Sequence, residues 1–85
     1  MRIRILSSIL AEKIGKEIEI KIGDEITLEE LKEIIAERFP DAREEIKDIF
    51  YNFSLNGRLI RAEEMKKVKV RDEDSIIIFP SIAGG

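Results

Sequence analysis

The chain has 85 residues, a length that fits one domain built around a single hydrophobic core. Hydrophobic residues make up 44% of the sequence and charged residues 39%, so the composition is that of a folded protein and excludes wholesale disorder. The formal net charge of −3 argues against nucleic acid as a main ligand, because phosphate binding needs a clustered basic surface.

The sequence contains neither cysteine nor histidine. Their absence excludes disulfides, thiolate nucleophiles, Cys/His zinc sites and a Ser–His catalytic triad. Carboxylates are plentiful, but on so acidic a surface we expect most of them only to contact water. We therefore expect no metal site, no bound cofactor and no catalytic centre made from the side chains of this chain, which by itself is not expected to be an enzyme.

The first residues do not resemble a secretory signal, because residues 1–5 alternate between polar and apolar instead of forming an apolar segment. No apolar run approaches the roughly 20 residues that a membrane span needs. We therefore expect a cytoplasmic protein that does not interact with membranes.

The first third of the chain predicts two strands. Ile3 and Ile5 alternate with arginines, and residues 17–22 ("EIEIKI") alternate more strongly, so each segment predicts a strand with one buried face. Between them, residues 7–16 form a short connection in which helical spacing of Leu10 and Ile14 indicates a helical turn. The short connection favours a hairpin of the two strands.

One main helix is expected from residue 28 to Phe39. Thr27 and Glu30 have the spacing of a capping box, and Pro40 ends the helix because it disfavours helical angles for the residue before it. The expected buried stripe consists of residues at helical spacing: Leu28, Leu31, Ile35 and Phe39. After the proline, Asp41 is the expected cap of a second, short helix that ends near Ile46.

The last third of the chain predicts a hairpin and a central strand. Residues 51–55 alternate, and Asn56-Gly57 is the strongest signal for a two-residue type I′ turn, with a short return strand at residues 59–60. Residues 63–67 read as a loop or helical turn. Residues 76–79 ("IIIF") are continuously apolar, which is typical of a strand covered on both faces at the centre of a sheet.

This order of elements predicts an α+β protein with the β-grasp, or ubiquitin-like, fold. The expected sheet is mixed and has about four to five strands, with one main helix packed on one face. The first and last strands would be adjacent and parallel. Residues 1–85 form one such domain in this interpretation, and residues 80–85 form a flexible C-terminal tail.

Five segments also resemble a known family, the small subunit of molybdopterin synthase within the wider group of ubiquitin-like sulfur carriers and archaeal small modifiers. The segments occur in the family's order and are spread over nearly the whole length of the chain: residues 10–16 (LAEKIGK), 37–40 (ERFP), 55–58 (LNGR), 74–76 (DSI) and 79–85 (FPSIAGG). The last segment is the most specific of them, since it closes a β-grasp chain of this size. The family commonly has a second proline where this chain has Ser81.

The resemblance implies a sulfur carrier that works through its last residue. An E1-like activating enzyme would use ATP to adenylate the Gly85 carboxylate, and sulfur transfer would then give a thiocarboxylate. As the small subunit of molybdopterin synthase, the chain would join a large subunit in a heterotetramer and donate its sulfur to a pterin precursor there. The catalytic side chains would belong to the large subunit.

Three alternatives stay open from the sequence. The chain could be a protein modifier joined through Gly85 to target lysines, or a sulfur donor for tRNA or thiamine thiolation. It could also be a β-grasp interaction domain with an inert tail.

Each part of the tail has properties that suit insertion into a partner. Pro80 lacks a backbone N–H, so it ends strand pairing before Ser81. Ile82 and Ala83 offer apolar surface, and Gly84 and Gly85 have no Cβ and so fit a narrow channel. We expect further partner contacts on the sheet face that the helix leaves uncovered. The candidates for these contacts are Phe79, Phe53, Leu55 and Arg58, although Arg58 has a simple solvated side chain as its alternative.

Overall fold

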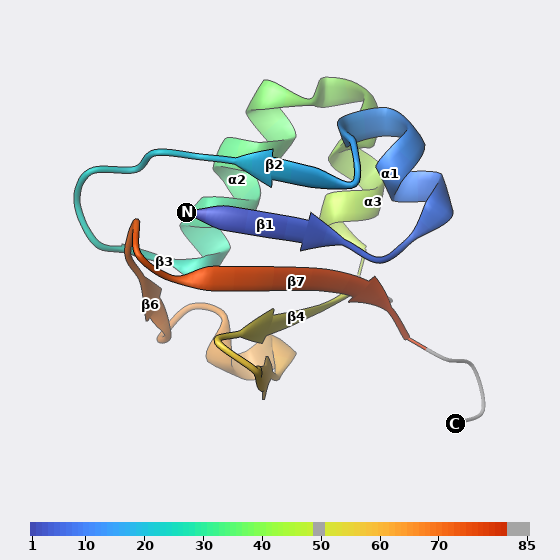
Figure 1. The fold of residues 1–85 in the computed structure, drawn as a ribbon. Helices are drawn as coiled ribbons and strands as arrows, with labels where there is room; N and C mark the ends of the chain where they lie inside the picture. The colour runs from blue at the N-terminus through green and yellow to red at the C-terminus, as the bar shows by residue number, and fades with distance from the viewer. Residues whose placement is uncertain (49–50, 82–85) are drawn as a thin grey trace.

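The alternating segments of the sequence form one mixed sheet in the computed structural model, which describes residues 1–48 and 51–81 (Figure 1). The sheet has five strands in the order β2-β1-β7-β4-β5. In chain order these strands are β1 (Arg2–Ile5), β2 (Glu17–Glu19), β4 (Tyr51–Leu55), β5 (Arg58–Ile60) and β7 (Ser75–Pro80). The first and last strands, β1 and β7, are adjacent and parallel, as predicted, and the other neighbours are antiparallel.

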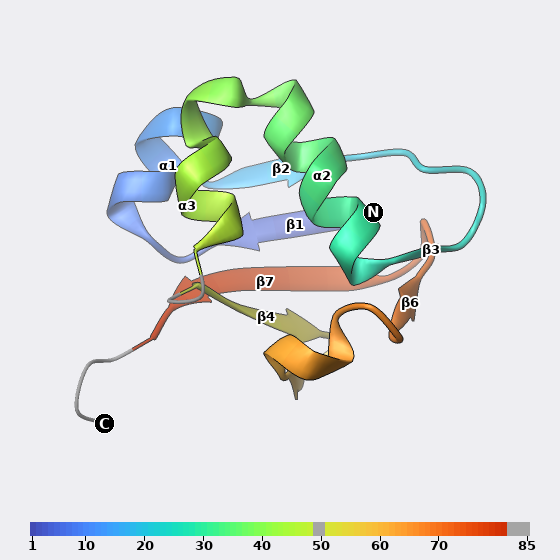
Figure 2. The same ribbon diagram turned by 180° about the vertical axis from the view of Figure 1, so that it is seen from behind.

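Helices α2 (Leu28–Arg38) and α3 (Arg43–Lys47) cover one face of this sheet, and α1 (Ser8–Ile14) packs against the same core beside β1 and β2. α2 and α3 lie behind the sheet in Figure 1 and in front of it in Figure 2. Alternate residues of the strands point at the helices, so Ile3, Ile76 and Ile78 are completely buried. The prediction of one main helix on one face is confirmed, and the connection expected to hold only a helical turn contains the full helix α1.

The central strand β7 is covered on one face only, so the expectation that both faces are buried was wrong. Ile76 and Ile78 are completely buried, whereas Ile77 and Phe79 remain partly exposed. The run of apolar residues reflects the central place of β7 between β1 and β4. Its second face is open because α2 and α3 pack on the first.

The start of α2 has the predicted capping box. The Thr27 hydroxyl accepts a hydrogen bond of 3.1 Å from the Glu30 N–H, and the Glu30 carboxylate accepts one of 3.0 Å from the Thr27 N–H. Leu28 and Leu31 are fully buried, and α2 gives way at Phe39 to a short 3-10 helix, η1 (Pro40–Ala42). Asp41 lies inside η1, so it does not cap α3; the residue at that position is Ala42, without a side-chain cap.

The structure also contains a second sheet, of two strands, which was not predicted. It pairs β3 (Ile26–Thr27) with β6 (Lys69–Val70), and it buries Val70 completely. The segment between β5 and β6 holds the 3-10 helix η2 (Ala62–Glu64), which agrees with the expected helical turn. The predicted β4–β5 hairpin is confirmed, because Asn56 and Gly57 both have positive φ, of 49° and 89°.

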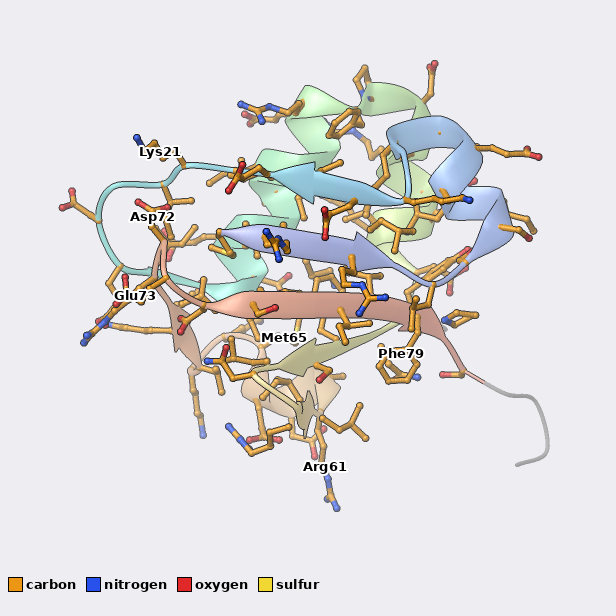
Figure 3. All side chains as sticks on the ribbon, viewed as in Figure 1. Lys21, Arg61, Met65, Asp72, Glu73 and Phe79 are labelled. Carbon is orange, nitrogen blue, oxygen red and sulfur yellow. The ribbon has the colours of Figure 1, made fainter. Side chains whose placement is uncertain are left out.

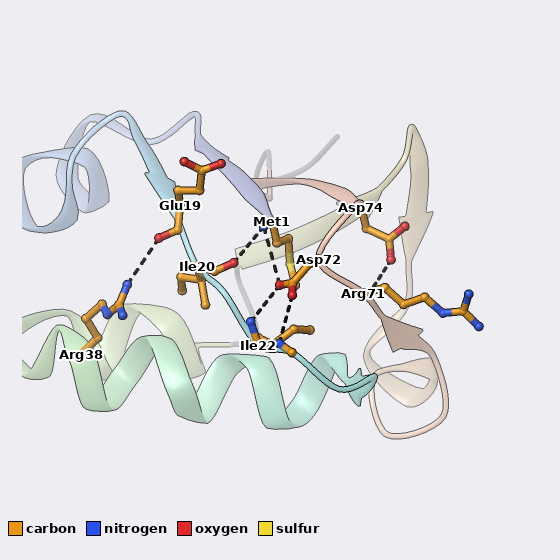
Figure 4. A network of polar contacts seen from close by, with 9 residues as sticks. Met1, Glu19, Ile20, Ile22, Arg38, Arg71, Asp72 and Asp74 are labelled. Carbon is orange, nitrogen blue, oxygen red and sulfur yellow. Dashed lines mark hydrogen bonds and ion pairs between the residues drawn. The ribbon is translucent and has the colours of Figure 1, made fainter.

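The carboxylate of Asp72 joins three parts of the chain (Figure 4). It accepts hydrogen bonds from the backbone N–H groups of Ile22, at 2.8 Å, and Gly23, at 3.0 Å. The ammonium group of Met1 lies 3.9 Å from the same carboxylate and donates a 2.8 Å hydrogen bond to the carbonyl oxygen of Ile20. These bonds, first among them the one from Ile22, lower the pKa of Asp72.

Candidate functional site

The candidate site begins where the central strand β7 ends. β7 pairs with β1 on one side and β4 on the other, and its last residue, Pro80, lies opposite Tyr51 of β4. Pro80 has no N–H to donate, so the ladder stops there. Because Pro80 belongs to the strand, the described part of the predicted tail starts at Ser81 and not at Pro80.

Several hydrogen bonds near the end of β7 connect the segments that lie around it. The N–H of Leu6 donates a 2.9 Å hydrogen bond to the Ile78 carbonyl, which continues the contact between the first and last strands. The hydroxyls of Ser7 and Tyr51 lie 3.2 Å apart and join the start of α1 to the start of β4. The Asn52 side-chain amide donates a 2.8 Å hydrogen bond to the Ser81 hydroxyl.

The other residues predicted for tail insertion and for the reaction lie outside the described residues. They are Ile82, Ala83, Gly84 and Gly85. The site is therefore described from the end of β7 and from the sheet face beside it.

That uncovered side of the sheet, here called the open face, carries an apolar strip. The strand register places Arg4, Ile77, Ser54 and Leu59 in one row across β1, β7, β4 and β5. Leu59 is 54% exposed and Ile77 is partly exposed. The row thus offers two apolar side chains, and the exposed side chain of Arg4 lies at one end of it.

A second part of the strip lies at the end of β7, next to the tail. Phe79 is opposite Asn52 on the open face and is partly exposed (Figure 3). Leu6, which follows β1 in the chain, is 56% exposed. Phe79 was predicted as a contact residue, whereas Leu6 and Leu59 were missed. Their signal in the sequence is their place in the strand alternation, opposite to that of the buried residues.

Phe53 and Leu55 do not lie on the open face, so their prediction as contacts there was wrong. Phe53 is 2% exposed and lies opposite both Ile78 and Ile60, which are core residues. Leu55 has the same orientation and packs against the core. The alternation in β4 correctly predicted that its side chains point to two faces. The apolar side chains, Phe53 and Leu55, face the helices, and the polar ones lie on the open face.

Arg58 is exposed but is directed toward η2. Its guanidinium lies 3.3 Å from the Glu64 carboxylate, and the register pairs Arg58 with Leu55 on the helix-covered side. The Arg61 N–H, in the first place, and the Arg58 guanidinium lower the pKa of Glu64. Arg58 therefore belongs to the edge of the sheet and not to the apolar strip.

Three carboxyl groups whose pKa is shifted form ion pairs at the surface of the protein. Hydrogen bonds from Arg71 to Glu25, from Lys47 to Glu33 and from Lys13 to Glu45 lower the pKa of each of these carboxyl groups. Within residues 1–48 and 51–81, acidic side chains form no group of three or more that could hold a metal ion. No helix in this part of the chain is long and apolar enough to cross a bilayer.

Comparison with known proteins gives one family and several similar folds. A sequence model of the ThiS family matches residues 5–85, whereas no curated protein matches the chain significantly. The structure of SAMP1 from Haloferax volcanii superimposes with a TM-score of 0.77 at 15% identity, covering 100% of this chain and 98% of that one.

Two other solved structures give the same fold. The small archaeal modifier protein 1 (SAMP1) from Methanosarcina acetivorans has a TM-score of 0.70 at 19% identity and covers 99% and 94% of the two chains. The thiamine biosynthesis protein ThiS from Geobacter metallireducens has a TM-score of 0.57 at 19% identity and covers 100% of both. The predicted β-grasp fold is thereby confirmed.

Proposed function

The chain belongs to the ThiS family of ubiquitin-like sulfur carriers and small modifiers, and from this premise we propose that it carries sulfur as a thiocarboxylate on Gly85. The observation that carries the proposal is the place of the diglycine segment. In the sequence only residues 81–83 separate it from β7, the strand with neighbours on both sides and two completely buried isoleucines. A well-supported strand thus ends five residues before the proposed reactive group.

The proposed reaction has two steps on an E1-like activating enzyme. A carboxylate oxygen of Gly85 attacks the α-phosphorus of ATP, pyrophosphate leaves, and an acyl adenylate forms. Hydrosulfide, or an equivalent sulfur nucleophile, then attacks the acyl carbon and expels AMP, which leaves the thiocarboxylate. The chain supplies the acyl group, and the activating enzyme supplies the catalytic side chains and binds ATP.

The composition of the tail suits entry into such an enzyme. Residues 82–85 span at most roughly 13 Å when extended, so the enzyme must contact the sheet close to the end of β7. Gly84 and Gly85 have no Cβ, which lets them pass a narrow channel. Ile82 and Ala83 would bury apolar surface along the channel.

The open face is the proposed docking surface for the activating enzyme. Phe79 and Leu6 lie next to the start of the tail, and Ile77 and Leu59 extend the same strip across the sheet. A few well-buried side chains near the centre of an interface, aromatic ones prominent among them, supply most of its binding energy. An enzyme bound there would have the tail within its reach.

We propose the large subunit of molybdopterin synthase as the sulfur acceptor, in a heterotetramer with this chain. The support is the resemblance of the whole chain, and above all of residues 79–85, to the small subunit of that enzyme. In this role the thiocarboxylate enters the active site of the large subunit and gives its sulfur to a pterin precursor. Two sulfur-loaded copies, mixed with the large subunit and the precursor, should supply the two sulfur atoms of a dithiolene product, and hydrolysis by water should leave each copy with a free Gly85 carboxylate.

The activation step is tested by ATP–pyrophosphate exchange with the E1-like enzyme from the same organism. The wild-type chain should support exchange, whereas a variant with one residue added after Gly85 should not, because its carboxylate lies one residue too far along. Thermal unfolding of both proteins should agree, which serves as the folding control. Failure of the wild-type chain to support exchange would instead indicate an interaction domain whose tail does not react.

A further inference from the structure

The last described residue, Ser81, is held by a side chain of the neighbouring strand. β7 ends at Pro80, and Ser81 follows it. The Asn52 side-chain amide of β4 donates a hydrogen bond of 2.8 Å to the Ser81 hydroxyl. This distance is in the normal range for a well-formed N–H···O bond.

The strand register shows on which side of the sheet this bond lies. Asn52 is opposite Phe79, so its amide reaches along β7 to the residue two positions further on. Asn52 and Phe79 both lie on the open face, because their neighbours Phe53 and Ile78 are buried on the other one. The hydrogen bond to Asn52 therefore places the Ser81 hydroxyl on the open-face side, together with Phe79.

Asn52 stands on a firmly held part of β4. The preceding residue, Tyr51, contacts the buried Ser7 through a hydroxyl pair 3.2 Å apart and lies opposite Pro80. The following residue, Phe53, is buried in the core. Asn52 itself is only partly exposed, which restricts the directions that its amide adopts.

We propose that Asn52 is a positioning residue for capture of the tail. Its bond to Ser81 keeps the first residue after β7 on the side of the sheet where, on the proposed function, the activating enzyme docks. Only residues 82–85 follow Ser81, and they span roughly 13 Å when extended. A chain that left β7 in another direction would therefore have difficulty in bringing Gly85 to the active site of the enzyme. Fixing this direction in the free chain lowers the entropy that is lost when the enzyme takes up the tail.

The bond is tested with Asn52→Ala, Ser81→Ala and the double variant in the ATP–pyrophosphate exchange assay, at varied concentrations of the chain. Each single variant should raise KM for the chain about two- to twelvefold, the range that the loss of one net hydrogen bond gives, with kcat unchanged. The double variant should raise KM no further than either single one, because all three lack the same bond. Ser81→Thr keeps a hydroxyl and should retain the wild-type KM.

The matched control is Lys47→Ala, which also removes an exposed side-chain contact, the ion pair with Glu33 between α3 and α2. It lies on the helix-covered side, so KM should not change. An NMR spectrum gives a readout that does not depend on activity: the side-chain amide signals of Asn52 should shift in Ser81→Ala and not in Lys47→Ala.

The outcomes separate this inference from the proposed function. If the wild-type chain supports no exchange, the proposed function fails, and the positioning role fails with it. If the wild-type chain is active but the Asn52 and Ser81 variants keep its KM, or if their effects on KM add up in the double variant, the positioning role alone is overturned.

Discussion

At the scale of single residues, Asp72 is the carboxyl group whose ionisation contributes to holding the fold together. It binds two N–H groups of the segment after β2 and lies near the ammonium group of Met1. These contacts favour the charged form, so the pKa of Asp72 is lower in the folded chain than in the unfolded one. The stabilisation is therefore present above the ordinary aspartate pKa of about 4 and is lost as the pH falls through the lower pKa of the folded chain.

Replacement of Asp72 by asparagine should lower the free energy of unfolding at pH 7 and make it less dependent on pH below about 5. Urea unfolding of both proteins at a series of pH values measures the difference. Subtracting the two curves removes the contribution of the other carboxyl groups. A variant that keeps the full acid sensitivity of the wild type would show that Asp72 is not a source of it.

Two phenylalanines on neighbouring strands should respond differently to replacement by alanine. Phe53 is 2% exposed, so Phe53→Ala should reduce the free energy of unfolding by about 3–5 kcal/mol. Phe79 is partly exposed on the open face, so Phe79→Ala should cost clearly less stability but raise KM for the activating enzyme about tenfold. Denaturant unfolding and the exchange assay measure the two effects. The open face would not be the docking surface if Phe79→Ala left KM unchanged.

The two faces of the sheet also show what could and could not be predicted from the sequence. The alternation of β4 indicates two sets of side chains, and the continuous apolar run in β7 correctly predicts its central place. Alternation alone does not say which set faces the helices, since that depends on how the whole sheet packs. Phe53 and Leu55 were therefore assigned to the wrong face, and the exposed Leu6 and Leu59 were overlooked.

At the scale of elements, local signals predicted what local contacts determine. The capping box of α2 and the type I′ turn of the β4–β5 hairpin depend on residues within four positions of one another, and both are present. The pair β3–β6 depends on two segments far apart in the chain, and each strand has only two residues, too few to show a period. The prediction of Asp41 as the cap of α3 failed for a local reason, because the 3-10 helix η1 takes up Pro40–Ala42 and α3 begins only at Arg43.

Removal of the cap of α2 should weaken the fold without affecting the site. Thr27→Ala leaves the Glu30 N–H without its hydroxyl partner and should lower the free energy of unfolding by about 1 kcal/mol. Glu37→Ala, an exposed change on the same helix, is the control and should have a smaller effect. If KM in the exchange assay rose in Thr27→Ala as it does in the Asn52 variants, the effect on KM would reflect stability and not position.

At the scale of the whole molecule, the architecture separates folding from function. Helices α2 and α3 cover one face of the sheet, the other face carries no helix within residues 1–48 and 51–81, and the central strand β7 ends at Pro80 (Figures 1 and 2). A chain without cysteine or histidine can still carry sulfur under the proposed function, because the sulfur would be bound to a backbone carboxyl carbon. The identity of the acceptor depends on contacts with another protein, which is why one sequence does not determine it.

The central claim is tested most directly by the intact mass of the chain after incubation with its E1-like activating enzyme, ATP and a sulfide source. The account predicts a mass gain equal to the replacement of one oxygen by sulfur, with fragment ions that assign it to Gly85. The gain should require ATP and should be absent from a variant that lacks Gly84 and Gly85. An unchanged mass, with an enzyme that is active on a known carrier, would contradict the proposal that this chain carries sulfur.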